Sequence, residues 1–345
     1  MAGQPGNQTS PSQPKKYSSV VCSFIWPKHP GYTGGEIREY HLLRGLLAAS
    51  QVTFLSLTSP AQDSRQELLG QVEALYSPEN IQKAHLSLGM QIKLIAGKIH
   101  TLLHKHQIPV IGPRYHAEFT YFSRQVEFWA LPTLRQIFQT QPPDFLFVSP
   151  QLNPLALQLE AAPPKTRLIF ATYDVEATRL ARLEATYRGL PRLAAHLETR
   201  RARRFERDNL IPYDGLIAVS DLDRETFARD YGFPPERILV IENSVDTDYF
   251  AFHPRNETDE KNIVFTANLG YRPNDDAARR LLTGIMPLVR RKIPAAKAWI
   301  VGQLPGRELL GLANEKNIVT GRVEDVRPYL QQASAACMPL RAGSG

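Results

Sequence analysis

The stretch SVVCSFIWPKHPGYTGGEIREY, residues 19–40, joins an apolar run with two adjacent valines to a glycine pair and then to a helical pattern. Glycine has no Cβ, so such a turn lets the backbone come close to a phosphate. The turn lacks the spacing GxGxxG, and no acidic residue ends the second strand. The stretch therefore predicts the first strand and helix of an α/β fold, and it argues against a nicotinamide-dependent oxidoreductase.

Apolar runs alternate with helical patterns through the first part of the chain, which predicts parallel α/β sheets. Strands are expected at residues 19–25, 52–57, 145–149, 167–171, 215–219 and 238–241. Helices are expected at residues 36–49, in a long stretch around 67–106, and at 121–139, 176–208 and 221–231. The last of these has Ser220 or Asp221 as its cap and Gly232 as its stop signal.

The same pattern starts again after the polar residues 253–261. Strands are expected at residues 262–266, 298–301, 317–320 and 335–338, and helices at 275–292, 307–315 and 326–333. We therefore predict a disordered leader over residues 1–17, one α/β domain over 18–252, a linker over 253–261, and a second α/β domain over 262–345. The final run PLRAGSG resembles a phosphate-binding glycine loop with no helix after it, so we expect the second domain to be C-terminally truncated.

Composition sets the class of protein. Hydrophobic residues make up 43% and charged residues 22% of the chain, as in soluble globular proteins. No apolar run reaches the roughly 20 residues of a membrane-spanning helix, and the leader has no apolar segment typical of a secretion signal. Cys22 and Cys337 lie in apolar runs and are expected to be buried free thiols, which favours a cytoplasmic protein. No CxxC or HExxH pair indicates a metal site.

One segment carries most of the net charge of +7. Residues 179–207 contain nine arginines and three glutamates. A solvated helix face explains this excess, and so does an electrostatic dock for an anionic membrane or a lipid phosphate. Nucleic acid is disfavoured because aromatic residues do not alternate with the basic ones.

Several motifs resemble those of the family 4 glycosyltransferases, and they occur in that family's order. They are the pattern PGxxGGExRxxH at residues 30–41, LIAVS at 216–220, IENSVD at 241–246 with YF at 249–250, VFTANLGYRPN at 264–274, VG at 301–302, TGRV at 320–323 and PLR at 339–341. The resemblance covers nearly all of residues 18–345. It implies the GT-B fold: two Rossmann-like domains that face each other across a cleft, with the second domain incomplete here.

The resemblance also implies a reaction and its partners. The N-terminal domain would bind a lipid-linked or polysaccharide acceptor, and the C-terminal domain a nucleotide sugar, with retention of configuration and without a metal or other cofactor. Gly34 and Gly35 would let the loop approach the donor phosphates or the acceptor, and Arg38 would contact the acceptor or a phosphate unless it is a surface residue. The other candidate donor-binding residues are Asn268, Arg272, Gly302, Arg322, Val323, Gly343 and Gly345.

The turn at residues 173–176 supplies the candidate catalytic residues. Tyr173 stands where the family usually has a histidine near the reacting sugar. Asp174 and Glu176 are carboxylates that would orient an acceptor hydroxyl, or that simply cap the following helix. The histidines 85, 100, 104 and 106 crowd one helical stretch, where exposure to solvent is favoured over metal binding.

Some positions depart from the family pattern. Ala267 and Ser244 stand where glycines are usual, Ala342 stands where many members have a glutamate, and a second glutamate would fall beyond Gly345. The alternatives to an active transferase are therefore an inactive relative that binds the acceptor and, less favoured, a nucleotide-sugar epimerase. The enzyme is expected in the cytoplasm, with peripheral contact to the inner face of the membrane through residues 179–207.

Overall fold

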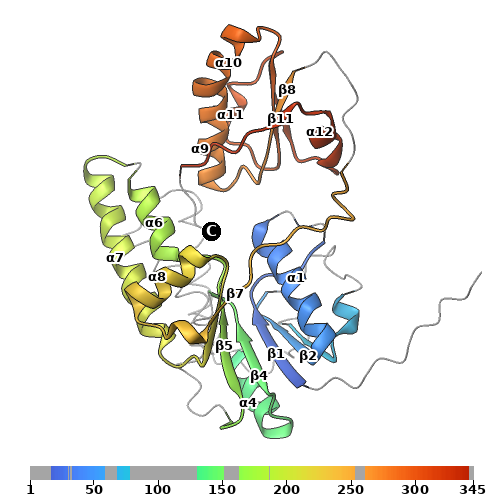
Figure 1. Cartoon of the computed structure of the whole chain (residues 1–345), viewed down its shortest axis with the longest axis vertical. Helices are drawn as coiled ribbons and strands as arrows, with labels where there is room; N and C mark the ends of the chain where they lie inside the picture. Colours follow the sequence, from blue (N-terminus) through green and yellow to red (C-terminus); the bar gives the residue numbers. More distant parts are fainter. Residues whose placement is uncertain are drawn as a thin grey trace, which may run out of the picture. The chain divides into compact units, whose positions relative to one another are not determined.

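The computed structural model of the chain describes residues 17–29, 31, 33–58, 68–77, 130–150, 163–185, 187–252 and 261–341. The chain divides into two compact units, and each contains one parallel sheet (Figure 1). Unit 1 consists of Met1–Val175 and Arg200–Asn243, and unit 2 of Glu176–Thr199 and Ser244–Gly345. The sequence-based domain boundaries at residues 252 and 262 stay predictions.

Unit 1 is built on seven parallel strands in the order β3-β2-β1-β4-β5-β6-β7. The strands are β1 (Tyr17–Ser23), β2 (Ser50–Ser56), β3 (Ala74–Tyr76), β4 (Phe145–Val148), β5 (Arg167–Ala171), β6 (Gly215–Ala218) and β7 (Ile238–Val240). The strand order reverses between β1 and β4. In open α/β sheets the carboxyl ends of the strands at such a reversal are where ligands bind.

Helices cover both faces of this sheet. They are α1 (Gly34–Ala49), α4 (Leu131–Thr140) and α8 (Asp221–Tyr231), while α6 (Glu176–Glu184) and α7 (Leu190–Leu210) lie between β5 and β6 in the chain. Successive strand residues point to opposite faces. Val20 and Cys22 therefore join the core under α4 and α8, and Val21 joins a second core with Leu43 and Leu47 of α1. Burial on both faces explains why the strands read as continuous apolar runs.

Unit 2 contains a smaller sheet of four parallel strands, in the order β10-β9-β8-β11. The strands are β8 (Asn262–Thr266), β9 (Lys297–Val301), β10 (Asn317–Gly321) and β11 (Ala335–Ala336). Its helices are α9 (Arg272–Arg280), which continues through a π-helical turn (Leu281–Ile285) into α10 (Met286–Lys292), and the short α11 (Arg307–Leu310) and α12 (Arg327–Gln332). The core under the α9–α10 segment contains Phe265, Leu281, Met286 and Ile300.

The sequence predicted most of these elements, and several bounds agree to the residue. The predicted α/β class with two parallel sheets is confirmed. The helix at Asp221–Tyr231 is also confirmed: Ser220 Oγ accepts from the Asp223 amide at 3.2 Å, and Gly232 has a left-handed φ of +71°.

Four predictions were wrong in detail. The long helix expected around residues 67–106 is wrong at its start, because residues 69–71 form a short 3₁₀ turn (Leu69–Gln71) and residues 74–76 form the edge strand β3, which pairs with β2. Residues 78–106 lie outside the described residues. The single helix over 176–208 is two helices, because the chain breaks before α7 at Gly189, where φ is +63°. The helix expected at 307–315 ends at Leu310, and the strand expected at 335–338 ends at Ala336.

Both cysteines are free thiols, but only Cys22 is fully buried, and Cys337 is half-buried. Burial raises the pKa of the Cys22 thiol far above its usual value, so it stays protonated. The histidines 85, 100, 104 and 106 lie outside the described residues. Among the helices that the structure describes, none has the length and apolarity needed to cross a bilayer.

Candidate functional site

A buried carboxyl group lies at the carboxyl ends of β1, β4 and β5 in unit 1. Glu39 of α1 is 3% exposed. Ser149, the residue after β4, donates a hydrogen bond to Glu39 Oε1 at 2.9 Å, and its Oγ lies 3.0 Å from Oγ of Ser23. The Tyr173 hydroxyl donates to the same Glu39 oxygen. Three strand ends and one helix thus meet at one carboxyl group.

The surroundings of Glu39 change how it titrates. Burial raises the pKa of the Glu39 carboxyl, while the hydrogen bonds from Tyr173 and Ser149 act in the opposite direction. Burial and the neighbouring Glu39 raise the pKa of Tyr173 well above its usual value. Tyr173 therefore keeps its proton at neutral pH and is a hydrogen-bond donor here.

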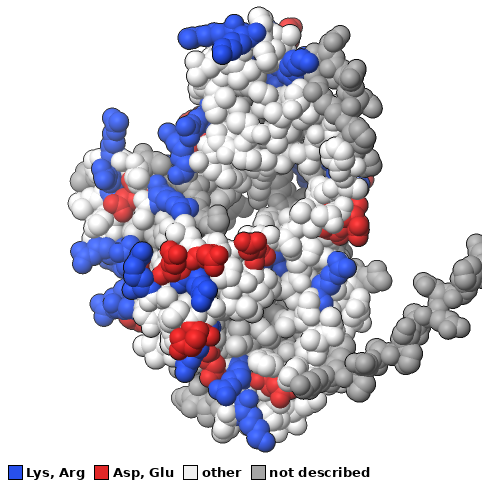
Figure 2. Space-filling view, in the orientation of Figure 1, with Lys and Arg blue, Asp and Glu red and all other residues white. Residues whose placement is uncertain are grey.

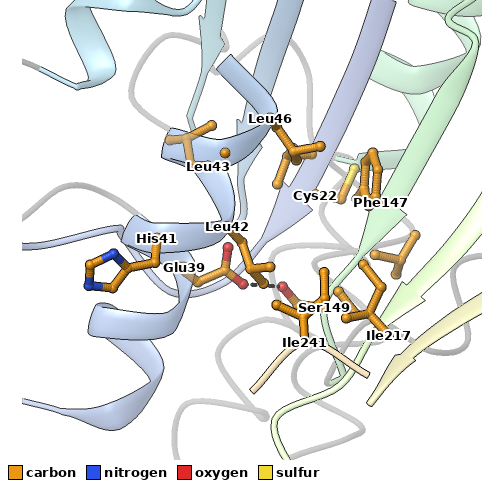
Figure 3. Close-up of a pocket in the computed structure, with 14 residues that line it drawn as sticks. Cys22, Glu39, His41, Leu42, Leu43, Leu46, Phe147, Ser149, Ile217 and Ile241 are labelled. Atoms are coloured by element: carbon orange, nitrogen blue, oxygen red, sulfur yellow. Dashed lines mark hydrogen bonds between the residues drawn. The ribbon is translucent and has the colours of Figure 1, made fainter. Parts of the chain in front are cut away.

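An apolar cavity of about 210 Å³ lies beside this carboxyl group. Leu42 and Leu46 of α1 line it, together with Phe147 and Ile217 of the sheet (Figure 3). In Figure 3 the carboxyl group of Glu39 points to Ser149. These apolar neighbours keep the carboxyl group away from water, and this desolvation is what raises its pKa.

Arg38 precedes Glu39 and is also buried, with 4% of its surface exposed. Its Nε donates to the carbonyl oxygen of Thr172 at 3.1 Å. Its Nη1 donates to the carbonyl oxygen of Ile241 at 2.9 Å and to Asn243 Oδ1 at 3.1 Å. The alternative that Arg38 is a surface residue is therefore wrong. The predicted contact of Arg38 with the acceptor or a phosphate stays a prediction.

The two glycines at the start of α1 differ in their surroundings. A Cβ on Gly35 would lie 2.5 Å from Ile25 Cδ1 and 3.9 Å from the Tyr173 ring, so Gly35 makes room for packing. A Cβ on Gly34 would meet nothing within 4 Å. Thr33 begins the helix with a capping box: its Oγ1 accepts from the Glu36 amide, and the Glu36 carboxylate accepts from the Thr33 amide. A side chain could therefore be added at position 34, but not at position 35, without disturbing the packing.

The turn after β5 holds the predicted catalytic residues. The Asp174 amide donates to Thr172 Oγ1 at 3.1 Å, which closes the turn, and Asp174 lies two residues before α6. Glu176 is in the first turn of α6 and forms a bidentate ion pair with Arg179. Arg179 therefore already occupies both carboxylate oxygens of Glu176, whereas Tyr173 faces Glu39.

In unit 2, the ends of β8 and β9 come into very close contact. A Cβ on Gly302 would lie 1.7 Å from the carbonyl oxygen of Ala267, and the φ of Gly302 is +156°. The Gly302 amide donates to the carbonyl oxygen of Gly321, at the end of β10, at 3.2 Å. Only glycine fits at position 302, and the reason in this structure is the Ala267 carbonyl group.

The turn that follows β8 holds two of the predicted donor-binding residues. Asn268 Oδ1 accepts from the Gly270 amide at 3.1 Å, and its carbonyl oxygen accepts from Asn274 Nδ2 at 2.9 Å. Arg272 begins α9, is exposed, and stacks over the Tyr187 ring at 4.7 Å from the ring centroid. The turn therefore holds Asn268 in place and leaves the guanidinium of Arg272 accessible.

The remaining predicted residues follow β10 or end the chain. Arg322 is exposed and Val323 is half-buried. Asn268, Gly302 and Arg322 come directly after or close to the carboxyl ends of β8, β9 and β10, which are adjacent in the sheet. Gly343 and Gly345 lie outside the described residues. Unit 2 thus places at the carboxyl ends of its strands those predicted donor residues of the C-terminal domain that the structure describes, while Gly34 and Gly35 lie in unit 1.

Sequence comparison gives the family. The profile described as "Glycosyltransferase Family 4" matches residues 32–249, and that described as "Glycosyl transferases group 1" matches residues 260–345. The chain belongs to the family 4 glycosyltransferases. No curated protein matches this glycosyltransferase in sequence.

Solved structures show that the fold of this glycosyltransferase is the GT-B fold. Sucrose-phosphate synthase from Thermosynechococcus elongatus superposes with a TM-score of 0.62 at 13% identity, over 95% of this chain and 77% of that one. A trehalose-phosphate synthase from Burkholderia xenovorans gives 0.56 at 14% identity, over 95% and 80%. A structure described as trehalose-6-phosphate from E. coli, bound with UDP-2-fluoro glucose, gives 0.56 at 12% identity, over 95% and 80%.

Sequence reasoning missed the groups that hold Tyr173 in this glycosyltransferase. Glu39 follows Arg38 in a helical pattern, where a glutamate is normally expected to be exposed to solvent. Ser23 and Ser149 each follow an apolar run, which is a weak sign that they stand at strand ends. The available sequence signal for Glu39 was its place on the side of the helix that carries the apolar residues and faces the sheet.

Proposed function

We propose that this family 4 glycosyltransferase transfers a sugar from a nucleotide-sugar donor to a lipid-linked or polysaccharide acceptor, with retention of configuration. Unit 2 would bind the donor, and unit 1 the acceptor. The observation that carries the proposal is the sheet edge of unit 2, where Asn268, Gly302 and Arg322 follow adjacent strands and Arg272 lies nearby. A structural relative is described as bound with UDP-2-fluoro glucose, which supports a nucleotide sugar as the donor.

The leaving group in such a transfer is a nucleoside diphosphate, which departs with added negative charge. Positive charge near its oxygens lowers the barrier. Arg272 is exposed at the first residue of α9, where the helix dipole adds to its charge. These two features support Arg272 as the group that stabilises the leaving diphosphate in place of a metal ion.

The acceptor side is assigned to the α1 start and the turn after β5. Gly34 leaves open space for a substrate group, and Asp174 is the carboxylate that would orient the acceptor hydroxyl. Tyr173 would support the reacting sugar through its ring, since its hydroxyl is engaged by Glu39. Glu176 would act through its ion pair with Arg179.

The acceptor is proposed to be carried by an anionic membrane, because α7 combines positive charge with exposed leucines. The arginines at positions 192, 200, 201, 203, 204 and 207 are exposed, and Leu193 and Leu197 are 58% and 47% exposed. Figure 2 shows basic side chains gathered over α7. Basic helices with exposed apolar residues bind anionic leaflets peripherally, which would place the enzyme at the cytoplasmic face of a membrane.

Calorimetric titration with UDP and GDP, each with and without Mg²⁺, tests the donor site. We expect micromolar binding of one nucleotide, unchanged when EDTA replaces Mg²⁺. Arg272→Gln should weaken binding about tenfold, the worth of one charge-assisted contact. Arg280→Gln, at an exposed position of the same helix, is the matched control. A folded chain that binds neither nucleotide contradicts the proposal and leaves an acceptor-binding protein as the better interpretation.

A further inference from the structure

Arg38 joins three segments of unit 1 that are far apart in the sequence. Its hydrogen-bond acceptors are Thr172, 134 residues away, and Ile241 and Asn243, more than 200 residues away. It lies in α1, whose first turn is fixed by the capping box of Thr33. The side chain therefore extends from a rigid helix to two non-helical segments of the chain.

The first of these segments is the turn after β5. Arg38 binds the carbonyl group of Thr172, and the next residue of α1, Glu39, binds the hydroxyl of Tyr173. Two consecutive helix residues thus hold two consecutive turn residues. Asp174 follows directly, and its amide is bonded to Thr172 Oγ1. The position of the candidate catalytic turn is therefore set by α1.

The second segment is the junction, which we define as residues 241–246. Its sheet pairing ends with the Ile241 amide, which donates to the carbonyl oxygen of Ala218 at 2.9 Å. The chain leaves unit 1 after Asn243, and residues 242–245 are exposed. Arg38 binds Ile241 and Asn243 at the point where regular pairing ends. The start of the junction is thus tied to the same guanidinium as the catalytic turn.

Arginine is needed for this contact. Its planar guanidinium presents donors in several fixed directions, whereas a lysine ammonium is a compact charge on a flexible stem. Burial lowers the pKa of Arg38, the nearby Tyr173 and Glu39 act in the opposite direction, and Nη2 has no partner among the described residues. Burying a cation with an unpartnered donor costs free energy, so the hydrogen bonds of Arg38 are better explained by the placing of these two segments than by net stabilisation.

We propose that Arg38 is a positioning residue for sugar transfer: it fixes the turn that carries Tyr173 and Asp174 and the start of the junction as one unit. The proposal rests on the proposed function for the reaction, but the anchoring itself is a property of unit 1 that is measurable without substrate. Arg38 touches neither donor nor acceptor in this role. Its loss should therefore change the rate of transfer and leave nucleotide affinity unchanged.

Hydrogen–deuterium exchange of the full chain measures the anchoring. Arg38→Lys keeps the charge and should speed exchange of amides in residues 172–176 and in the junction by about tenfold, with β1 and β2 unchanged. Asn243→Ala removes one acceptor at an exposed position and should affect the junction only. Arg44→Lys, exposed on the same helix, should change neither segment. Unchanged exchange in either segment, or faster exchange throughout the sheet, overturns the proposal.

Kinetics tests the link to the reaction. Release of UDP from UDP-glucose, or of GDP from GDP-mannose, should fall about tenfold in kcat for Arg38→Lys, while the calorimetric Kd for the nucleotide stays within about twofold. A change in Kd without a change in kcat overturns the positioning role. Wild-type protein that binds neither nucleotide contradicts the proposed function instead, and the exchange experiment still decides whether Arg38 anchors the two segments.

Discussion

The hydroxyl of Tyr173 donates a hydrogen bond to the buried carboxyl group of Glu39, which lies 134 residues earlier in the chain. This contact fastens the turn after β5 to α1. It also fixes the direction of the Tyr173 ring, which packs beside Gly35 and lies 6.4 Å, between ring centroids, from Phe24. Tyr173, which sequence resemblance assigns to the reacting sugar, is thus fixed in position by a buried residue of unit 1.

Tyr173→Phe should lower the free energy of unfolding by about 1–3 kcal/mol, because it removes a donor from a buried carboxyl group. Urea denaturation measures the loss. Tyr76→Phe is the control, since Tyr76 is also half-buried in unit 1 and its hydroxyl makes no hydrogen bond to any of the described residues. Combined with Glu39→Gln, the Tyr173 change should be non-additive. Additive effects of the two changes would show that the contact does not form in solution.

Glu39 should make the stability of the protein depend on pH in a definite direction. Burial raises the folded-state pKa of Glu39 above the value of about 4.3 in an unfolded chain. The folded state then binds the proton of Glu39 more tightly than the unfolded chain does. The stabilisation that comes from this tighter proton binding is complete below about pH 4 and is lost as the pH rises through the folded-state pKa.

The Glu39→Gln variant cannot ionise and should escape this loss. The free energy of unfolding of the variant relative to wild type should therefore increase with pH across that window and then level off. Urea denaturation at a series of pH values measures the difference. Glu225→Gln, at an exposed position of α8, controls for the loss of a carboxylate. Parallel curves for wild type and Glu39→Gln would contradict the raised pKa.

The sequence predicted what local pattern controls. The strands Arg167–Ala171 and Asn262–Thr266 were predicted to the residue, because each is a short apolar run with polar flanks. The edge strand β3 was missed, because three residues without a β-branched side chain become a strand only by pairing with β2. Glu39 was missed for a related reason. Its burial depends on Ser149 and Tyr173, and no local pattern encodes contacts over such distances.

Alanine substitutions at Gly302 and Gly34 should separate folding from binding. Gly302→Ala forces a Cβ against the carbonyl oxygen of Ala267, so unit 2 should lose about 3 kcal/mol or more. Gly34→Ala meets no neighbour and should leave the thermal midpoint unchanged. If the α1 start approaches a substrate, Gly34→Ala should still weaken binding or turnover. Calorimetry of unfolding and substrate titration together measure this, and a Gly34→Ala protein with unaltered binding and turnover would remove Gly34 from the site.

Charge reversal on α7 should weaken membrane binding without affecting the fold. Arg200 and Arg204 are exposed and lie one helical turn apart. Each basic residue near an anionic leaflet contributes about 1 kcal/mol, so reversing both should lower the partition coefficient by more than about tenfold. The measurement is co-sedimentation with phosphatidylglycerol-containing vesicles and, for comparison, with phosphatidylcholine vesicles.

Two controls separate this surface from net charge and from apolar contact. Arg280→Glu with Arg291→Glu makes the same change in net charge at exposed positions of α9 and α10, and it should leave vesicle binding nearly unchanged. Leu193→Ser with Leu197→Ser should weaken the binding that remains at high salt, because apolar insertion is not screened by ions. Equal loss in the two charge-reversal variants would mean that net charge, rather than α7, brings the protein to the membrane.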